Sequence, residues 1–270
     1  MKKLTFNDFV DSINFLKNKL NDFWTLGNAT SLSEESGGQK LEFYRGPLLY
    51  ALICHLKPKQ ILEFGTGGGY STLCMAKALV DSKIDGKIYT IDRVGNTEKI
   101  SRFYQLPLNK HPQKNNISNY EIWQSVAPSE WIKKIIPLQG YSGVVMDKNN
   151  FQNIDFCYID GTHSYDGTKH DFLSFLQIAS NNFSVLFDDY IEREFYGVKE
   201  FIDEEVEPNF NSFLIDTDPN KDFLQFIKKE HDYGMVYFKH ESNFSALKNY
   251  NEIEINSFLK QYRNNDSRIR

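Results

Sequence analysis

The stretch ILEFGTGGGYST at residues 61–72 constrains the fold of this chain more than any other part of it. A short apolar run meets the acid Glu63, glycines follow, and Ser71 and Thr72 open a run with apolar residues at helical spacing. Glycine tolerates a positive φ and lets another group approach the backbone closely. The stretch therefore predicts a buried strand, a tight glycine turn and a helix, which together form the repeating unit of a parallel α/β sheet.

Two well-known glycine-rich loops fit this stretch poorly. A dinucleotide fingerprint needs a glycine where this chain has Tyr70, and a phosphate-binding P-loop needs a Gly-Lys-Ser/Thr sequence that is absent. The stretch resembles the first motif of the class I S-adenosylmethionine-dependent methyltransferases, acid-x-Gly-x-Gly-x-Gly, whose loop passes under the methionine part of the cofactor. The cofactor-binding residues that this resemblance implies here are Glu63, Gly65, Thr66, Gly67, Gly69 and Ser71.

Strand and helix signals alternate along the middle of the chain, which indicates a mainly parallel sheet with both faces covered. Further strands are predicted at residues 87–92, 155–160 and 183–187, and a final antiparallel pair at residues 210–215 and 235–238. We therefore expect an α/β fold with a Rossmann-like, doubly wound, seven-stranded, mostly parallel sheet. One strand is expected to be antiparallel, with helices on both faces and an N-terminal helical extension.

The division into domains follows changes in composition along the chain. Residues 1–24 place apolar side chains at helical spacing, and a polar, glycine-containing stretch follows, so residues 1–45 are predicted as a helical extension and loop. Residues 46–240 form the predicted methyltransferase domain. Residues 241–270 form the predicted C-terminal tail.

An insertion of about residues 93–134 interrupts the predicted domain. It leaves two candidates for the third strand, residues 120–124 and residues 135–139. The second is favoured because the sequence GYS and a short helical segment follow it. Tyr141 and Ser142 then stand at the end of this strand, where the resemblance implies contacts with the adenine of the cofactor.

Acidic residues stand at the ends of three predicted strands. Asp92 ends the second strand, where a carboxylate can accept hydrogen bonds from both ribose hydroxyls of a cofactor, including the ribose of NAD. Asp160 ends the fourth strand, and Asp188 and Asp189 end the fifth. Open α/β sheets bind ligands beyond the carboxyl ends of their strands, so we expect the last three acids to converge.

Three converging carboxylates raise one another's pKa unless a cation relieves the repulsion. Neither cysteines nor clustered histidines accompany Asp160, Asp188 and Asp189 in the sequence. The pattern thus indicates a hard divalent cation, Mg²⁺ first and then Ca²⁺ or Mn²⁺. The alternative is that Asp188 and Asp189 are helix caps in a metal-independent enzyme.

The run IDGTHSYDGTKHDF from Ile159, followed by VLFDDY and GVKEFIDE, is similar to the metal-dependent O-methyltransferases. The likeness is to the bacterial sugar enzymes of macrolide biosynthesis and to the group containing catechol O-methyltransferase, and it covers roughly residues 45–206. It implies that Asp160, Asp188 and Asp189 hold Mg²⁺. It also implies that His163, three residues after Asp160, is the general base. Asp160 is predicted in addition as a catalytic residue and as a cofactor contact. Among the six histidines, only His163 has such a setting, and its ordinary pKa near 6.5 suits proton abstraction.

The predicted function is methyl transfer from S-adenosyl-L-methionine to a hydroxyl of a sugar or diol-like small molecule. Rival hypotheses are an NAD-dependent oxidoreductase, a non-catalytic cofactor-binding protein and a nucleic-acid methyltransferase. The net charge of −5 argues against nucleic acid, and no apolar run approaches the roughly 20 residues of a membrane span. Three cysteines in apolar segments and an N-terminus interrupted by polar residues favour a cytoplasmic protein. Sugar enzymes of this type often assemble, so the resemblance also allows a homo-oligomer.

Overall fold

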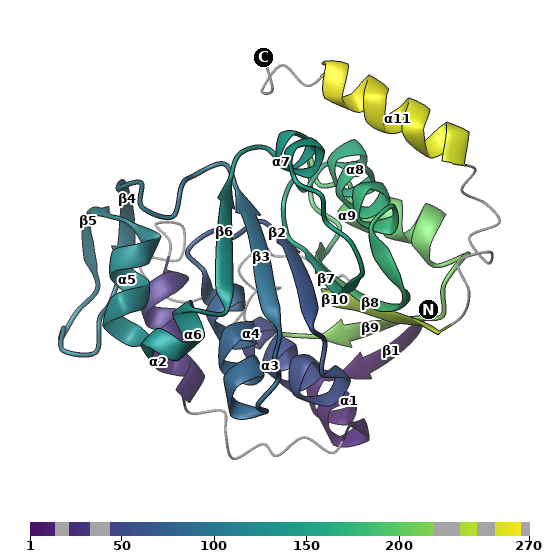
Figure 1. Ribbon diagram of the computed structural model, residues 1–270. Coiled ribbons are helices and arrows are strands. Elements are labelled where there is room, and N and C mark those ends of the chain that lie inside the picture. Colours follow the sequence, from purple (N-terminus) through teal and green to yellow (C-terminus); the bar gives the residue numbers. More distant parts are fainter. Residues whose placement is uncertain (14–21, 33–43, 219–232, 242–251, 266–270) are drawn as a thin grey trace.

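An eight-stranded sheet forms the centre of the protein in a computed structural model that describes residues 1–13, 22–32, 44–218, 233–241 and 252–265. The strands follow the spatial order β1-β9-β10-β8-β7-β2-β3-β6 (Figure 1). They are β1 (Lys2–Thr5), β2 (Gln60–Phe64), β3 (Lys87–Asp92), β6 (Ile135–Gln139), β7 (Ile154–Ile159), β8 (Ala179–Tyr190), β9 (Ser212–Asp216) and β10 (Gly234–Glu241).

Strand β10 runs antiparallel to both of its neighbours, β8 and β9, whereas the other pairs of this sheet are parallel. The predicted α/β fold with one antiparallel strand is therefore confirmed. The predicted third strand at residues 135–139 is β6, which pairs with β3. The rejected candidate at residues 120–124 lies inside a helix, α5 (Asn119–Val126).

The predicted count of seven strands is wrong, because Lys2–Thr5 adds an eighth strand beside β9. The helical periodicity of the N-terminus begins only at Phe6, whose helix α1 (Phe6–Ser12) buries Phe6, Phe9 and Val10. The Thr5 side chain accepts a hydrogen bond from the Asp8 amide and so fixes where the helix starts. Residues 2–5, which end at the cap, form a parallel ladder with β9, and a helical periodicity does not reveal it. Residues 14–21 lie outside the described residues.

Helices cover both faces of the sheet, as predicted (Figure 1). Adjacent strand residues alternate between faces: Ile61 packs with α3 and α4, and Leu62 with α8 and α9. The helices around the sheet include α3 (Arg45–Leu56), α4 (Tyr70–Asp81), α7 (Ser142–Lys148), α8 (Tyr165–Leu176) and α9 (Val198–Phe201). The last of these continues as a π-helical turn over Ile202–Val206. Cys74 and Cys157 are buried, and Cys54 is half-buried.

The insertion folds as a hairpin of β4 (Ile100–Tyr104) and β5 (Gln113–Ile117), followed by α5 and α6 (Ser129–Ile132). It lies beside α2 (Asp22–Thr30) at one end of the molecule (Figure 1). A last helix, α11 (Glu252–Asn265), packs on α8. Among the described residues, none of the helices has the length and apolar character that a membrane span requires. The proposed division at residues 45 and 240 stays a prediction.

Candidate active site

A cavity of about 250 Å³ opens beyond the carboxyl ends of β2, β3 and β6. Four residues predicted to bind the cofactor line it: Gly65, Asp92, Tyr141 and Ser142. Gly161 and Thr162, which follow the end of β7, form another part of its wall. The cavity thus lies where an open α/β sheet binds ligands, at the ends of parallel strands.

Glu63 and Ser71, although predicted to bind the cofactor, brace the glycine loop from behind. Glu63 is completely buried, and its carboxylate accepts hydrogen bonds of 2.5 Å from Ser71, Thr72 and Thr90. Burial raises the pKa of Glu63 to about 7, against the effect of these donors. Thr66 is also buried, with its hydroxyl 2.6 Å from that of Thr90. These side chains fix the loop from within the protein.

Asp92 holds the glycine loop and also lines the cavity. Its Oδ2 accepts a hydrogen bond from the Gly67 amide and its Oδ1 one from the Val94 amide, both at 2.8 Å. Each carboxylate oxygen has two lone pairs, so both oxygens keep the capacity to accept from a ligand hydroxyl. The position therefore agrees with a role in binding a ribose.

Close packing of the chain on itself explains most of the loop glycines. A Cβ on Gly65 would lie 2.0 Å from the carbonyl oxygen of Asp160, and one on Gly68 would lie 1.8 Å from that of Thr30. A Cβ on Gly69 would lie 2.3 Å from Trp123 Nε1. Gly67, by contrast, has open space around the Cβ position, and only its φ of +52° favours glycine.

The insertion supplies two loop-binding residues that the sequence patterns did not reveal. Trp123 donates its indole N–H to the Gly68 carbonyl at 3.0 Å, and Asn119 donates its side-chain amide to the Gly67 carbonyl at 2.9 Å. Both residues lie on α5, more than fifty positions along the chain from the loop. No local sequence signal marks such a long-range pairing.

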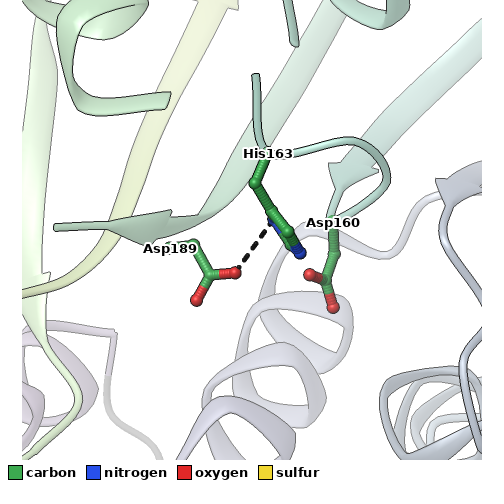
Figure 2. A group of neighbouring side chains, drawn as sticks. All are labelled: Asp160, His163 and Asp189. Atoms are coloured by element: carbon green, nitrogen blue, oxygen red, sulfur yellow. Dashed lines mark ion pairs between the residues drawn. The ribbon is translucent and has the colours of Figure 1, made fainter. Parts of the chain in front are cut away.

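His163 lies between two carboxylates beyond the ends of β7 and β8 (Figure 2). Its Nδ1 is 3.1 Å from Asp189 Oδ2, and candidate ligand atoms of Asp160, His163 and Asp189 all lie within 4.8 Å of one another. The imidazole stacks on the ring of Tyr196, with centroids 4.7 Å apart and planes 4° apart. This stacking holds the plane of the imidazole ring.

Asp188 is engaged elsewhere, although it was predicted as a metal ligand with Asp160 and Asp189. Its Oδ2 accepts from Tyr158 at 2.6 Å and pairs with Arg45 Nη2 at 2.8 Å, and its Oδ1 accepts from the Asp189 amide. Asp160 and Asp189 come together as predicted, and His163 completes their group.

Arg45 is the main cation at this end of the sheet. Its Nη1 lies 3.0 Å from Asp160 Oδ2, so one guanidinium joins Asp160 to Asp188. Burial opposes its charge, but Asp188 and its neighbours outweigh that effect and raise the pKa of Arg45. Sequence analysis missed Arg45, which lies 115 positions from Asp160 and in no motif.

The site carries an excess of negative charge. Burial raises the pKa of Asp160, an effect that Arg45 opposes. Burial and then the charge of Asp188 raise the pKa of Asp189. Arg45 pairs with Asp160 and Asp188, whereas Asp189 lies against His163 and feels the charges of Arg45 and Arg193 at longer range. Three carboxylates so close together favour a further positive charge, whether a cation, a proton or an imidazolium.

Residues 62–190 match the family model described as "Methyltransferase domain". In structure, the chain is similar to cofactor-bound Rv0187 from MTB, with a TM-score of 0.52 and 16% identity over 74% of this chain and 81% of that one. It is also similar to the O-methyltransferase from Bacillus cereus, crystallised in complex with SAH, with a TM-score of 0.51 and 14% identity over 86% of this chain and 94% of that one. These likenesses confirm the expected fold.

Among curated proteins, the chain is similar to uncharacterized protein y4gI of Sinorhizobium fredii. The two are 26% identical over 157 residues, which are 58% of this chain and only 16% of that protein. The matched part of this chain therefore spans a small fraction of that relative's length.

Proposed function

We propose, on the premise that residues 62–190 match a methyltransferase domain, that the protein transfers a methyl group from S-adenosylmethionine to a hydroxyl oxygen of a small molecule. One observation carries the proposal. Thr162 lines the cavity, and the next residue, His163, lies between Asp160 and Asp189. A methyl donor in the cavity and a base for the acceptor hydroxyl are thereby brought side by side.

The cavity supports S-adenosylmethionine as the donor. Gly65 gives it a wall of bare backbone, Asp92 offers carboxylate oxygens, and Tyr141 offers an aromatic ring. These groups suit, in that order, the methionine part, the ribose and the adenine. The match to a methyltransferase domain supports this assignment over the rival NAD-dependent oxidoreductase.

His163 is the proposed general base. Asp189 Oδ2 lies 3.1 Å from Nδ1 and favours the neutral tautomer with its proton on Nδ1, which leaves the lone pair of Nε2 to accept the hydroxyl proton. The acceptor oxygen then attacks the sulfonium methyl in line, the C–S bond breaks, and the sulfur leaves as a neutral thioether. Asp189 stabilises the imidazolium that results.

The residues present fit a divalent cation. Asp160 and Asp189 offer carboxylate oxygens, which suit Mg²⁺, Ca²⁺ or Mn²⁺. When bound, such a cation lowers the pKa of an acceptor hydroxyl and orients its oxygen. A pair of adjacent hydroxyls chelates a cation well, which supports a sugar or another diol as the acceptor class.

Metal-independent transfer is the second candidate, and Arg45 favours it. Its guanidinium already neutralises part of the acidic group through Asp160 and Asp188. In that case the Asp189–His163 pair alone activates the acceptor hydroxyl.

Isothermal titration with S-adenosylmethionine tests the proposal, in EDTA and then with Mg²⁺ or Mn²⁺ and a panel of diol acceptors. We expect cofactor binding in EDTA and acceptor binding only with the cation. Acceptor binding and turnover in EDTA would establish the metal-independent form. Binding of NADH without binding of S-adenosylmethionine would overturn the proposal.

A further inference from the structure

Helix α11 is anchored on the domain by one arginine. Arg263 donates through Nε to His170 Nε2 at 3.2 Å and through Nη2 to Ser174 at 3.4 Å, and its Nη1 pairs with Asp147. The partners lie on α8 and α7, so a single side chain ties α11 to two helices. Leu259 of the same helix is buried, which adds an apolar contact.

The receiving surface is shaped for this side chain. A Cβ on Gly143 would lie 3.2 Å both from Arg263 Cγ and from His170 Nε2, so a larger residue would crowd the arginine. His170 is 1% exposed, and its other nitrogen is 3.0 Å from Asp171 Oδ1. Because Nε2 accepts from Arg263, the proton of the neutral His170 ring is on Nδ1 and is donated to Asp171. A continuous chain of hydrogen bonds thus runs from Arg263 through His170 to Asp171.

This chain of contacts ends at the cavity beyond β2, β3 and β6. Asp171 and Tyr262 both line that cavity, together with Tyr141 and Gly143. The ring of Tyr262 stacks on His170, with centroids 4.7 Å apart. The residue next to the anchor therefore places an aromatic ring in the wall of the cavity, on the side where Tyr141 follows β6.

We propose that α11 is a cofactor-binding element, in which Tyr262 contacts the adenine of S-adenosylmethionine and Arg263 positions Tyr262. The inference rests on the proposed function, which supplies the occupant of the cavity. The flat face of a purine suits an aromatic wall, because stacking needs no particular hydrogen-bond pattern. Helix α11 lies on the same side of the molecule as α7 and α8 (Figure 1), and it packs on α8.

Titration calorimetry with S-adenosylhomocysteine tests this inference on the full chain, without any acceptor. Removing a stacked aromatic ring costs about tenfold in affinity. We expect Tyr262→Ala and Arg263→Ala each to weaken binding by about that factor, and Tyr262→Phe to retain it. Lys260→Ala, at an exposed position of the same helix, is the matched control and leaves binding unchanged. Thermal unfolding of the ligand-free variants verifies that each one is folded.

The outcomes separate this inference from the proposed function. Binding by the unaltered protein, with Tyr262→Ala and Arg263→Ala equal to Lys260→Ala, overturns the role of α11 and leaves the methyltransferase intact. Failure of the unaltered protein to bind S-adenosylhomocysteine overturns both. If Tyr262→Ala does not fold, Tyr262→Leu replaces it, since leucine keeps apolar bulk and loses the aromatic face.

Discussion

The ligand-binding edge of the sheet has two halves, at the ends of β2 and β3 and at the ends of β7 and β8, and they differ in how their acidic side chains are paired. At the ends of β2 and β3, the chain itself satisfies the acids: Glu63 receives three hydroxyl donors and Asp92 two backbone amides. At the ends of β7 and β8, Asp160 and Asp188 share the Arg45 guanidinium, and Asp189 lies against His163. The first half is organised before any ligand arrives, and the second keeps charge that a ligand or a proton can satisfy.

Backbone conformation shows the same contrast. Positive φ angles in the glycine loop fall on Gly65, Gly67 and Gly69, which adopt them without strain. At the end of β8, Asp189 has a φ of 55°, a conformation that is uncommon for a residue with a side chain. Unfavourable local conformations cluster at functional sites, where the surrounding structure enforces them. Under the proposed function, the first half positions the cofactor and the second carries the chemistry.

The largest expected effect is the loss of turnover in His163→Ala. If turnover were retained, the ends of β7 and β8 would not carry the chemistry. His163→Ala removes the proposed base and should lower turnover by about 10²–10⁴-fold while S-adenosylhomocysteine binding is retained. Methyl transfer to a diol panel measures turnover, and calorimetry measures binding. The matched control is His111→Ala, at an exposed histidine of the insertion. Equal turnover in both variants would remove His163 from the mechanism.

Replacing Arg45 tests whether the acidic side chains at the ends of β7 and β8 need a positive charge beside them. Arg45→Met leaves Asp160 and Asp188 without their guanidinium partner. Asp188 is buried and Arg45 is half-buried, so the loss in free energy of unfolding should be about 3 kcal/mol, the lower end of the range for breaking a buried pair. Urea unfolding measures the loss, and added Mn²⁺ should restore part of it. Lys99→Met breaks an exposed pair with Glu121 and should change little. A loss in Arg45→Met no larger than this control would show that the acids do not need the guanidinium.

The third prediction concerns the pH dependence of stability that the buried Glu63 should cause in the half at the ends of β2 and β3. Its pKa is about 7 in the folded protein against an ordinary value of 4.5, so the folded state binds the proton more tightly. Stability should therefore fall by about 3 kcal/mol as pH rises from about 4.5 to about 7. In Glu63→Gln this part of the pH dependence disappears. Urea unfolding of both proteins across that range measures it, and parallel curves would contradict the assignment.

The smallest expected effect is that of removing the hydrogen bond from Trp123, in the insertion, to the glycine loop. Trp123→Phe removes the indole donor from the Gly68 carbonyl and should lower the free energy of unfolding by about 1–2 kcal/mol. Trp24→Phe, at a half-exposed tryptophan, is the control and should have a smaller effect. The two variants are compared by urea unfolding. Equal losses would mean that the hydrogen bond to the glycine loop contributes nothing measurable.

Local patterns in the sequence predicted much of this fold. The alternation of strands and helices, the single antiparallel strand and the third strand at residues 135–139 follow from periodicity and order along the chain. The N-terminal strand was missed, because only its pairing with β9 makes residues 2–5 a strand. The placement of Asp92 and Tyr141 at the cavity was also predictable, since parallel strands end at one edge.

The sequence by itself determined that acids, glycines and His163 meet at one edge of a parallel sheet, because strand ends are marked locally by apolar runs and turn residues. The tertiary structure alone decided how those groups share partners. It assigned Asp188 to Arg45 and Tyr158, grouped His163 with Asp160 and Asp189, and placed Tyr262 of α11 at the cavity. Several of these contacts join residues far apart in the chain, such as Arg45 and Asp160, which are 115 positions apart. They depend on burial and charge balance in three dimensions, which local sequence patterns do not encode.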